Sequence, residues 1–126
     1  MIGASKIYVR NKSKACEEVG IQFEEHILPE KTSMDELLEL IDNLNNNITI
    51  HGILLQSPIP YNLDINKAFS AISPEKDVDG FNPINVGKLS LGQDCFVPCT
   101  PYGILKLLEE YKIQLEGKKC VILRKK

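Results

Sequence analysis

Apolar residues recur at helical spacing in four stretches of the chain. The clearest pattern follows Ser33 and Glu36, whose types and spacing predict a capping box at the start of a helix. Ser5 and Gly20 are the expected N-cap and the stop of the first helix. Three further helices are predicted. One covers residues 5–19, one begins at Asp64 and one begins at Thr100.

Three shorter apolar stretches predict strands at 22–28, 48–55 and 119–123. The 48–55 stretch is nearly continuous in apolar character, which is typical of a strand buried on both faces of a parallel sheet. Strands that alternate with helices predict an α/β domain with the helices packed on the sheet. Ligands of such sheets bind at the carboxyl ends of the strands, where Gln56 directly follows the 48–55 strand.

The segment 73–99 is rich in Pro, Gly, Asp and Asn and has no sustained periodicity. We therefore predict a loop, and loops of this length are usually functional. Within it, Asp77 is expected to serve the loop structure.

Charge and hydropathy exclude two classes of partner. The 15 basic and 17 acidic residues give a formal net charge of -2, so no strong positive field is available to hold nucleic acid. No apolar stretch approaches the roughly 18 residues that a membrane-spanning helix needs. The N-terminus lacks the apolar region of a secretory signal, which predicts a cytoplasmic protein with reduced thiols.

The metal-ligating residues are too scattered to predict a metal site. Four cysteines are spread over the chain, and the closest pair, Cys95 and Cys99, has three residues between its members rather than two. Only two histidines could add to them. We expect no metal and interpret the cysteines as small core or loop residues.

Tyr8 and Lys12 lie four residues apart on the first predicted helix, so their side chains should share one face. A planar heterocycle could stack on the Tyr8 ring while the Lys12 amine reaches an atom at its edge. The alternative is a solvated lysine that extends over a half-buried tyrosine. The pair alone does not decide between them.

Four short segments carry a resemblance to a known family. They are 5–12 (SKIYVRNK), 54–60 (LLQSPIP), 76–81 (KDVDGF) and 98–103 (PCTPYG). In this order and at this approximate spacing they resemble the methylenetetrahydrofolate dehydrogenase/cyclohydrolases, and the likeness extends through 14–20, 85–89 and the helix after Thr100. It covers nearly the whole chain.

The resemblance implies a role for five residues. Lys12 would be the acid/base group, Tyr8 would pack against the folate, and Gln56 would support the lysine. A neutral amide can hold an amine without favouring its charged form as a carboxylate would. Asp79 would hold the amino-pyrimidine edge of the pterin, and Pro98 is a further folate-contacting candidate. Both also have structural interpretations, as a turn residue and as part of a helix start.

The resemblance also implies a three-layer, parallel-sheet α/β folate-binding catalytic domain in residues 1–116, without the family's first helix and strand. Residues 117–126 would be a remnant of the start of the NADP-binding Rossmann domain, with Leu123 in place of its first expected glycine. The family's cofactor is NADP, its substrate is a folate, and the full-length enzyme is typically a homodimer.

Two hypotheses about function follow. In the first, the chain is an enzyme of one-carbon metabolism, whose family oxidises 5,10-methylenetetrahydrofolate with NADP and hydrolyses the 5,10-methenyl product to 10-formyltetrahydrofolate. Only the hydrolysis needs no nicotinamide. In the second, the chain is an inactive gene remnant or fragment, at most a folate-binding module or a residual cyclohydrolase.

Overall fold

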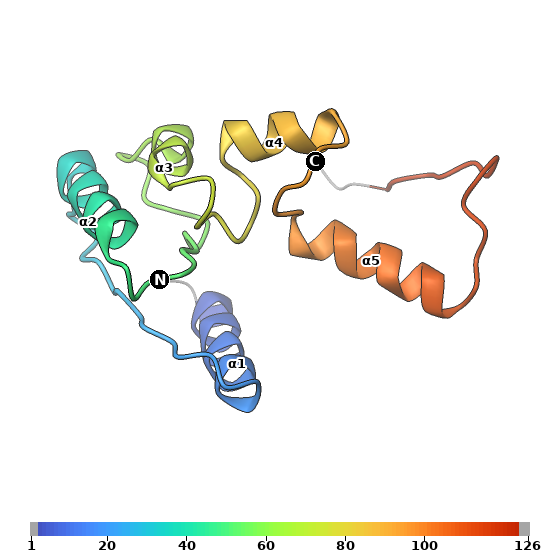
Figure 1. The fold of residues 1–126 in the computed structure, drawn as a ribbon. Coiled ribbons are helices and arrows are strands. Elements are labelled where there is room, and N and C mark those ends of the chain that lie inside the picture. The colour runs from blue at the N-terminus through green and yellow to red at the C-terminus, as the bar shows by residue number, and fades with distance from the viewer. Residues whose placement is uncertain (1–2, 124–126) are drawn as a thin grey trace. The chain divides into compact units, whose positions relative to one another are not determined.

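The computed structural model of the chain describes residues 3–123, with side chains from Ile7 onward. The described residues form two compact units, which belong to Met1–Lys31 and Thr32–Lys126. None of the described helices is long and apolar enough to cross a membrane. The helices are α1 (Gly3–Glu18), α2 (Met34–Asn46), α3 (Ile65–Ala71), α4 (Pro83–Ser90) and α5 (Cys99–Glu110) (Figure 1).

In the first unit, α1 ends as the sequence predicts. Gly20 has a φ of +76°, which a glycine adopts without the steric cost of a side chain. The Ile21 N–H donates to the Cys16 carbonyl at 2.8 Å, and the Gly20 N–H donates to the Glu17 carbonyl at 3.1 Å. This pair of hydrogen bonds is a Schellman motif, which satisfies carbonyls that the end of a helix leaves open.

Two predictions for this unit are wrong. Because Gly3 and Ala4 already have helical geometry, Ser5 lies inside α1 and is not its N-cap. Residues 22–28 form no strand, and their side chains are exposed. A strand needs a neighbour to satisfy its backbone groups, and the described residues of this unit contain no second extended segment that pairs with it.

In the second unit, α2 and α3 pack against each other (Figure 1). Their apolar faces, together with one side chain from the segment before Gln56, form the core. Leu37 and Ile41 lie one helical turn apart, so both point to the same side of α2. The buried apolar residues of the described chain are Leu37, Ile41, Ile53, Ala68 and Ile72.

Both helices begin where the sequence predicts. The Ser33 hydroxyl accepts a hydrogen bond from the Glu36 N–H at 3.2 Å, and the Glu36 carboxylate accepts one from the Ser33 N–H at 2.7 Å. The predicted capping box is therefore confirmed. Asp64 is the N-cap of α3, where its carboxylate accepts hydrogen bonds from the N–H groups of Asn66 and Lys67.

The prediction of a buried strand at 48–55 is wrong. Within the described residues this stretch makes one isolated parallel bridge, between Ile53 and Asp77. Ile53 is buried, whereas Ile48 is 90% exposed. The predicted strand at 119–123 is also absent, and its side chains are exposed. Apolar residues favour burial, but a strand forms only where a second segment pairs with it along its length.

The predicted loop at 73–99 contains an eight-residue helix, α4. Its start has a local cause: the Asn82 side-chain carbonyl accepts a hydrogen bond from the Ile84 N–H at 2.8 Å, and Pro83 occupies the first turn. Apolar periodicity did not predict this helix because the buried residue of α4 is polar, Asn85.

Helix α5 begins at Cys99, one residue before the predicted start. The prediction that it packs on a sheet is wrong for the described residues, in which no sheet forms. None of its residues is buried, and the apolar side chains of Ile104, Leu107 and Tyr111 are more than half exposed.

Candidate functional site

The Tyr8 and Lys12 side chains meet on the surface of α1. The Lys12 Nζ lies 4.4 Å from the centroid of the Tyr8 ring, within the range of a cation–π contact. Tyr8 is 53% exposed, and Lys12 is partly buried. The expected geometry of the pair is thus confirmed, and an aromatic surface and an amine are presented together.

Gln56 carries an acceptor without a partner. Its Nε2 donates to the Ser57 carbonyl at 2.8 Å. Its Oε1 is buried and has no hydrogen-bond partner among the described residues. A buried acceptor without a donor is costly, which makes this oxygen a candidate to receive an N–H from a ligand or a side chain.

Asp79 lies in a tight turn. The Gly80 N–H donates to the Asp77 carbonyl at 3.2 Å, and Gly80 has a φ of +69°. The structural interpretation of Asp79 as a turn residue is therefore correct, and a role in binding is compatible with it. Its side chain is partly buried.

Close contacts at two glycines join this turn to two neighbouring segments. A Cβ added at Gly80 would lie 2.6 Å from the Phe96 carbonyl oxygen and 3.1 Å from Pro98 Cδ. A Cβ added at Gly52 would lie 2.6 Å from Val78 Cγ1. The segments that carry Gln56, Asp79 and Pro98 therefore pack together in the second unit, with glycines at the closest approaches.

A buried cluster of polar side chains supports the turn that carries Asp79. The Asp77 Oδ2 accepts hydrogen bonds from the Asn82 N–H at 2.8 Å and from Asn85 Nδ2 at 2.9 Å. Asn82 Nδ2 donates in turn to the Ile72 carbonyl at 2.8 Å, at the end of α3. The structural role of Asp77 was predicted from the sequence, but the roles of the two asparagines were not. Asn82 had one signal, the Asn-Pro helix start, and Asn85 had none.

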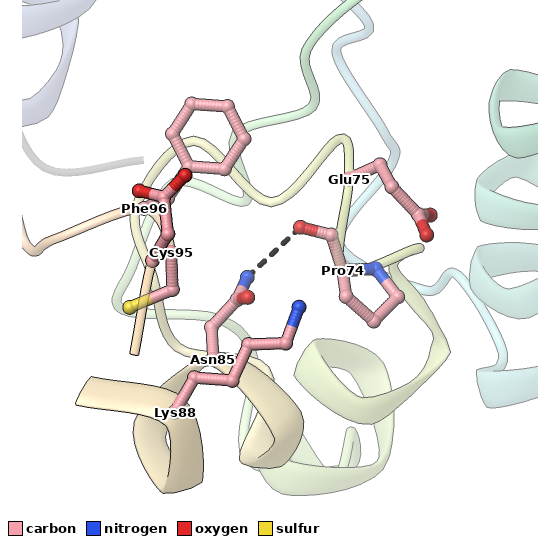
Figure 2. A pocket seen from close by; sticks show the side chains of 7 residues that line it. Pro74, Glu75, Asn85, Lys88, Cys95 and Phe96 are labelled. Carbon is pink, nitrogen blue, oxygen red and sulfur yellow. Dashed lines mark hydrogen bonds between the residues drawn. The ribbon is translucent and has the colours of Figure 1, made fainter. Parts of the chain in front are cut away.

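A surface hollow of about 350 Å³ lies beside this cluster. Figure 2 shows Asn85 and Lys88 rising from α4 toward the turn at Pro74 and Glu75, and Asn85 donates to the Pro74 carbonyl at 2.9 Å. A hydrogen bond from the Ser73 hydroxyl lowers the pKa of Glu75. The hollow contains none of the five predicted site residues.

No group of three or more His, Cys, Asp or Glu side chains in the described residues could hold a metal ion. Among the predicted site residues, Asp79 supplies the one carboxylate and Lys12 the one amine. This set suits hydrogen bonding, stacking and proton transfer on an organic ligand.

Comparison with known proteins identifies the family. The family model described as tetrahydrofolate dehydrogenase/cyclohydrolase, catalytic domain, matches residues 2–79. The chain belongs to the tetrahydrofolate dehydrogenase/cyclohydrolase family. The resemblance to this family is thereby confirmed.

Relatives in this family match almost the whole chain. It is 54% identical to the bifunctional protein FolD of Methanosarcina barkeri, with 95% of this chain and 42% of that protein covered. The FolD of Moorella thermoacetica is 57% identical, with 95% and 43% covered. The chain thus spans about two fifths of the length of the curated relatives it matches.

Solved structures of the family share the fold. The bifunctional FolD of Campylobacter jejuni matches with a TM-score of 0.90 at 49% identity, over 93% of this chain and 42% of that one. The enzyme of Trypanosoma brucei, solved with NADP and an inhibitor, matches with a TM-score of 0.88 at 34% identity, over 93% and 40%. The predicted fold of the family's catalytic domain is confirmed by these matches, but its parallel sheet is not, since the described residues form a single parallel bridge.

The residues present do not fit a dinucleotide cofactor. None of the eight glycines of the sequence forms the Gly-x-Gly pair of a dinucleotide-binding turn. Residues 117–123 form neither helix nor strand and are exposed. The predicted Rossmann remnant at 117–126 stays a prediction, and its last three residues lie outside the described residues.

Proposed function

We propose that this chain supplies the folate-binding and proton-transfer part of a methylenetetrahydrofolate dehydrogenase/cyclohydrolase in one-carbon metabolism. The observation that carries the proposal is the contact of the Lys12 amine with the exposed Tyr8 ring at 4.4 Å, inside the segment that matches the family model. The reaction best suited to these residues is the hydrolysis of 5,10-methenyltetrahydrofolate to 10-formyltetrahydrofolate.

In the proposed reaction, Lys12 moves protons. The oxygen of a water molecule bonds to the methenyl carbon, and the Lys12 amine accepts a proton from it. The bond from that carbon to N5 then breaks, the carbon keeps the oxygen as a formyl group on N10, and N5 receives a proton. One proton of the water ends on N5 and the other is released, so atoms and charge balance without an oxidant.

The other site residues bind and orient the folate. The Tyr8 ring stacks on the planar pterin. The Asp79 carboxylate accepts hydrogen bonds from the donor-rich edge of the amino-pyrimidine, and Pro98 adds an apolar contact beside it. The family resemblance assigns Gln56 to the support of the lysine, and its Oε1, which has no partner among the described residues, is an acceptor that this role can use.

The dehydrogenase reaction needs a nicotinamide over the folate, and the residues of this chain do not fit one. We therefore assign no step of hydride transfer to it. A second candidate function is folate binding without catalysis, for which the half-exposed Tyr8 ring supplies a stacking surface.

Hydrolysis of 5,10-methenyltetrahydrofolate, followed by the loss of its chromophore, separates the two functions. We expect Lys12→Ala to lower kcat by roughly 100-fold or more, the contribution of a general acid/base. Lys14→Ala is the matched control, since Lys14 lies exposed on the same helix and should leave the rate unchanged. Equal rates for wild type and Lys12→Ala would overturn the assignment of catalysis.

A double-mutant cycle tests Gln56. If Gln56 acts by holding the Lys12 amine, Gln56→Ala should slow wild type but have little further effect in the Lys12→Ala background. If the two substitutions lowered the rate by independent factors that multiply in the double variant, the proposed support of Lys12 by Gln56 would be contradicted.

Binding of folate is tested separately at Tyr8. Tyr8→Ala should weaken binding about tenfold, in line with base–aromatic stacking, while Tyr8→Phe should keep the affinity. Tyr111→Ala, at the exposed end of α5, is the control. An affinity that is independent of Tyr8 would remove the stacking role.

The proposal includes a cytoplasmic enzyme that acts as part of a homodimer and binds neither nucleic acid nor membrane. The four cysteines are all free thiols, which fits a reducing compartment. Analytical ultracentrifugation over a range of concentrations would test the dimer.

A further inference from the structure

The loop 77–82, which carries Asp79 at its centre, is closed by a buried carboxylate. Asp77 is 1% exposed, and its Oδ2 receives the N–H of Asn82, five residues further along the chain. The same oxygen receives Asn85 Nδ2 from α4. Both asparagines are almost completely buried as well. The two ends of the loop are thus joined by a side chain and anchored to a helix.

The backbone on either side of Asp79 is also fixed. The Ile53 N–H donates to the Lys76 carbonyl at 2.7 Å, next to the Ile53–Asp77 bridge. On the other side of the loop, Gly80 lies against the Phe96 carbonyl with no space for a side chain. The apolar anchors of the loop are weaker, since Val78 is only partly buried and Phe81 is 45% exposed. The direction of the Asp79 side chain therefore depends mainly on the hydrogen bonds that fix the backbone of the loop.

We infer that Asp77 is a positioning residue for the folate: its carboxylate closes the 77–82 loop and so sets the direction in which Asp79 presents its own carboxylate. This inference rests on the proposed function of Asp79. Hydrogen bonds to a charged acceptor are stronger than neutral ones, so a neutral residue at 77 holds the loop less firmly. A small change in the direction of a carboxylate is enough to spoil a paired hydrogen-bond contact with a planar ligand.

The test measures the dissociation constant of 5-formyltetrahydrofolate, a chemically stable folate probe, for wild type and five variants of the chain. We expect Asp77→Asn and Asp79→Asn each to weaken binding about tenfold, and the double variant to bind no more than about twofold more weakly than Asp79→Asn alone. In the hydrolysis assay, Asp77→Asn should raise KM and leave kcat nearly unchanged. The matched control is Asn45→Ala. Asn45 also joins two helix ends by part-buried hydrogen bonds, to Ala71 and Ser73, but lies outside the loop.

The control separates positioning from stability. Asn45→Ala should lower the melting temperature and leave the dissociation constant unchanged. Asn85→Ala removes one of the two donors to Asp77 and provides a second variant, with the same direction of effect on affinity, should Asp77→Asn fail to fold.

The outcomes distinguish the proposed role of Asp79 from the positioning role of Asp77. If wild type does not bind the probe, or Asp79→Asn binds it as tightly as wild type, the proposed role of Asp79 and this inference are overturned together. If Asp79→Asn weakens binding but folded Asp77→Asn and Asn85→Ala bind like wild type, this inference alone is overturned. If the factors by which Asp77→Asn and Asp79→Asn raise the dissociation constant multiplied in full in the double variant, this inference would also be overturned, because Asp77 would then act independently of Asp79.

Discussion

Replacing Lys76 by Met should destabilise the second unit by removing the charge that caps α2. The Lys76 Nζ donates to the carbonyls of Leu44, Asn45 and Asn47 at 3.0, 2.6 and 2.8 Å. These oxygens lie in the last turn of α2 and at its C-cap, where helix carbonyls lack partners within the helix and the helix dipole favours a positive charge. Methionine keeps most of the apolar stem and removes only the ammonium.

The expected magnitude follows from the exposure of this site. Hydrogen bonds from a charged donor can contribute about 1.5–3 kcal/mol each. The three bonds share one ammonium on a half-buried side chain, so water replaces part of what is lost and their energies do not add in full. A partly buried charge at a helix C-terminus contributes up to about 2 kcal/mol. We therefore expect Lys76→Met to lower the free energy of unfolding by about 2 kcal/mol.

Urea unfolding measures this loss, and Lys67→Met on the exposed surface of α3 is the control. Amide exchange should also accelerate most in the last turn of α2. A loss below about 0.5 kcal/mol, the usual range of surface substitutions, would contradict a capping role of the Lys76 ammonium. So would a loss equal to that of Lys67→Met.

Three further predictions concern the capping box, the core and the Asp79 turn. Hydrogen bonds from the backbone N–H and hydroxyl of Ser33 lower the pKa of Glu36 below its ordinary 4.5. This carboxylate therefore stabilises the fold above pH 4.5, and the contribution is lost as the pH falls through the lowered pKa. In urea unfolding, Glu36→Gln should lose less stability on acidification than wild type, and an unchanged pH dependence would contradict this role of Glu36. Ile72 is 2% exposed, so Ile72→Ala should cost about 3 kcal/mol and Ile72→Val about 1 kcal/mol in the same assay, whereas equal costs would argue against a packed core there. Gly80→Ala should lower the free energy of unfolding by about 2 kcal/mol or more and weaken folate binding, because left-handed strain adds to the contact with the backbone at Phe96. In the control Gly92→Ala, where φ is +67° and the space is open, only the strain of about 1 kcal/mol should appear, and equal losses in the two variants would exclude the contact as a cause.

The starts of α2 and α3 could be predicted because each depends on residues only a few positions apart. Ser33 with Glu36, and Asp64 with the two amides that follow it, close their hydrogen bonds within three residues. The contact between Tyr8 and Lys12 is equally local, since a helix brings residues four apart onto one face. In each case the geometry is fixed once the residue types and their spacing are known.

The strands could not be predicted in the same way. The apolar run at 48–55 expresses a preference for burial, but a strand also needs a remote segment to pair with it. Asp77, which lies 24 positions after Ile53, forms a β-bridge with Ile53 alone, and Ile48 is left exposed. The role of Asn85 was invisible for a related reason: an isolated asparagine indicates nothing until the fold brings a carboxylate to it.

The segment that carries Asp79 is part of the framework of the second unit, and this follows from what is buried there. Thr32, Asp77, Asn82 and Asn85 are as buried as the five apolar core residues. From within a few residues of Asp79, Lys76 reaches the end of α2, and Asn82 reaches the end of α3 and the start of α4. Each of these hydrogen bonds satisfies a helix terminus that would otherwise lack a partner. A change that removes one of these hydrogen bonds from Lys76 or Asn82 should therefore also loosen the loop. For the same reason, a ligand held by Asp79 should stabilise helix ends that it does not touch, because it favours the one arrangement of the loop in which they are all satisfied.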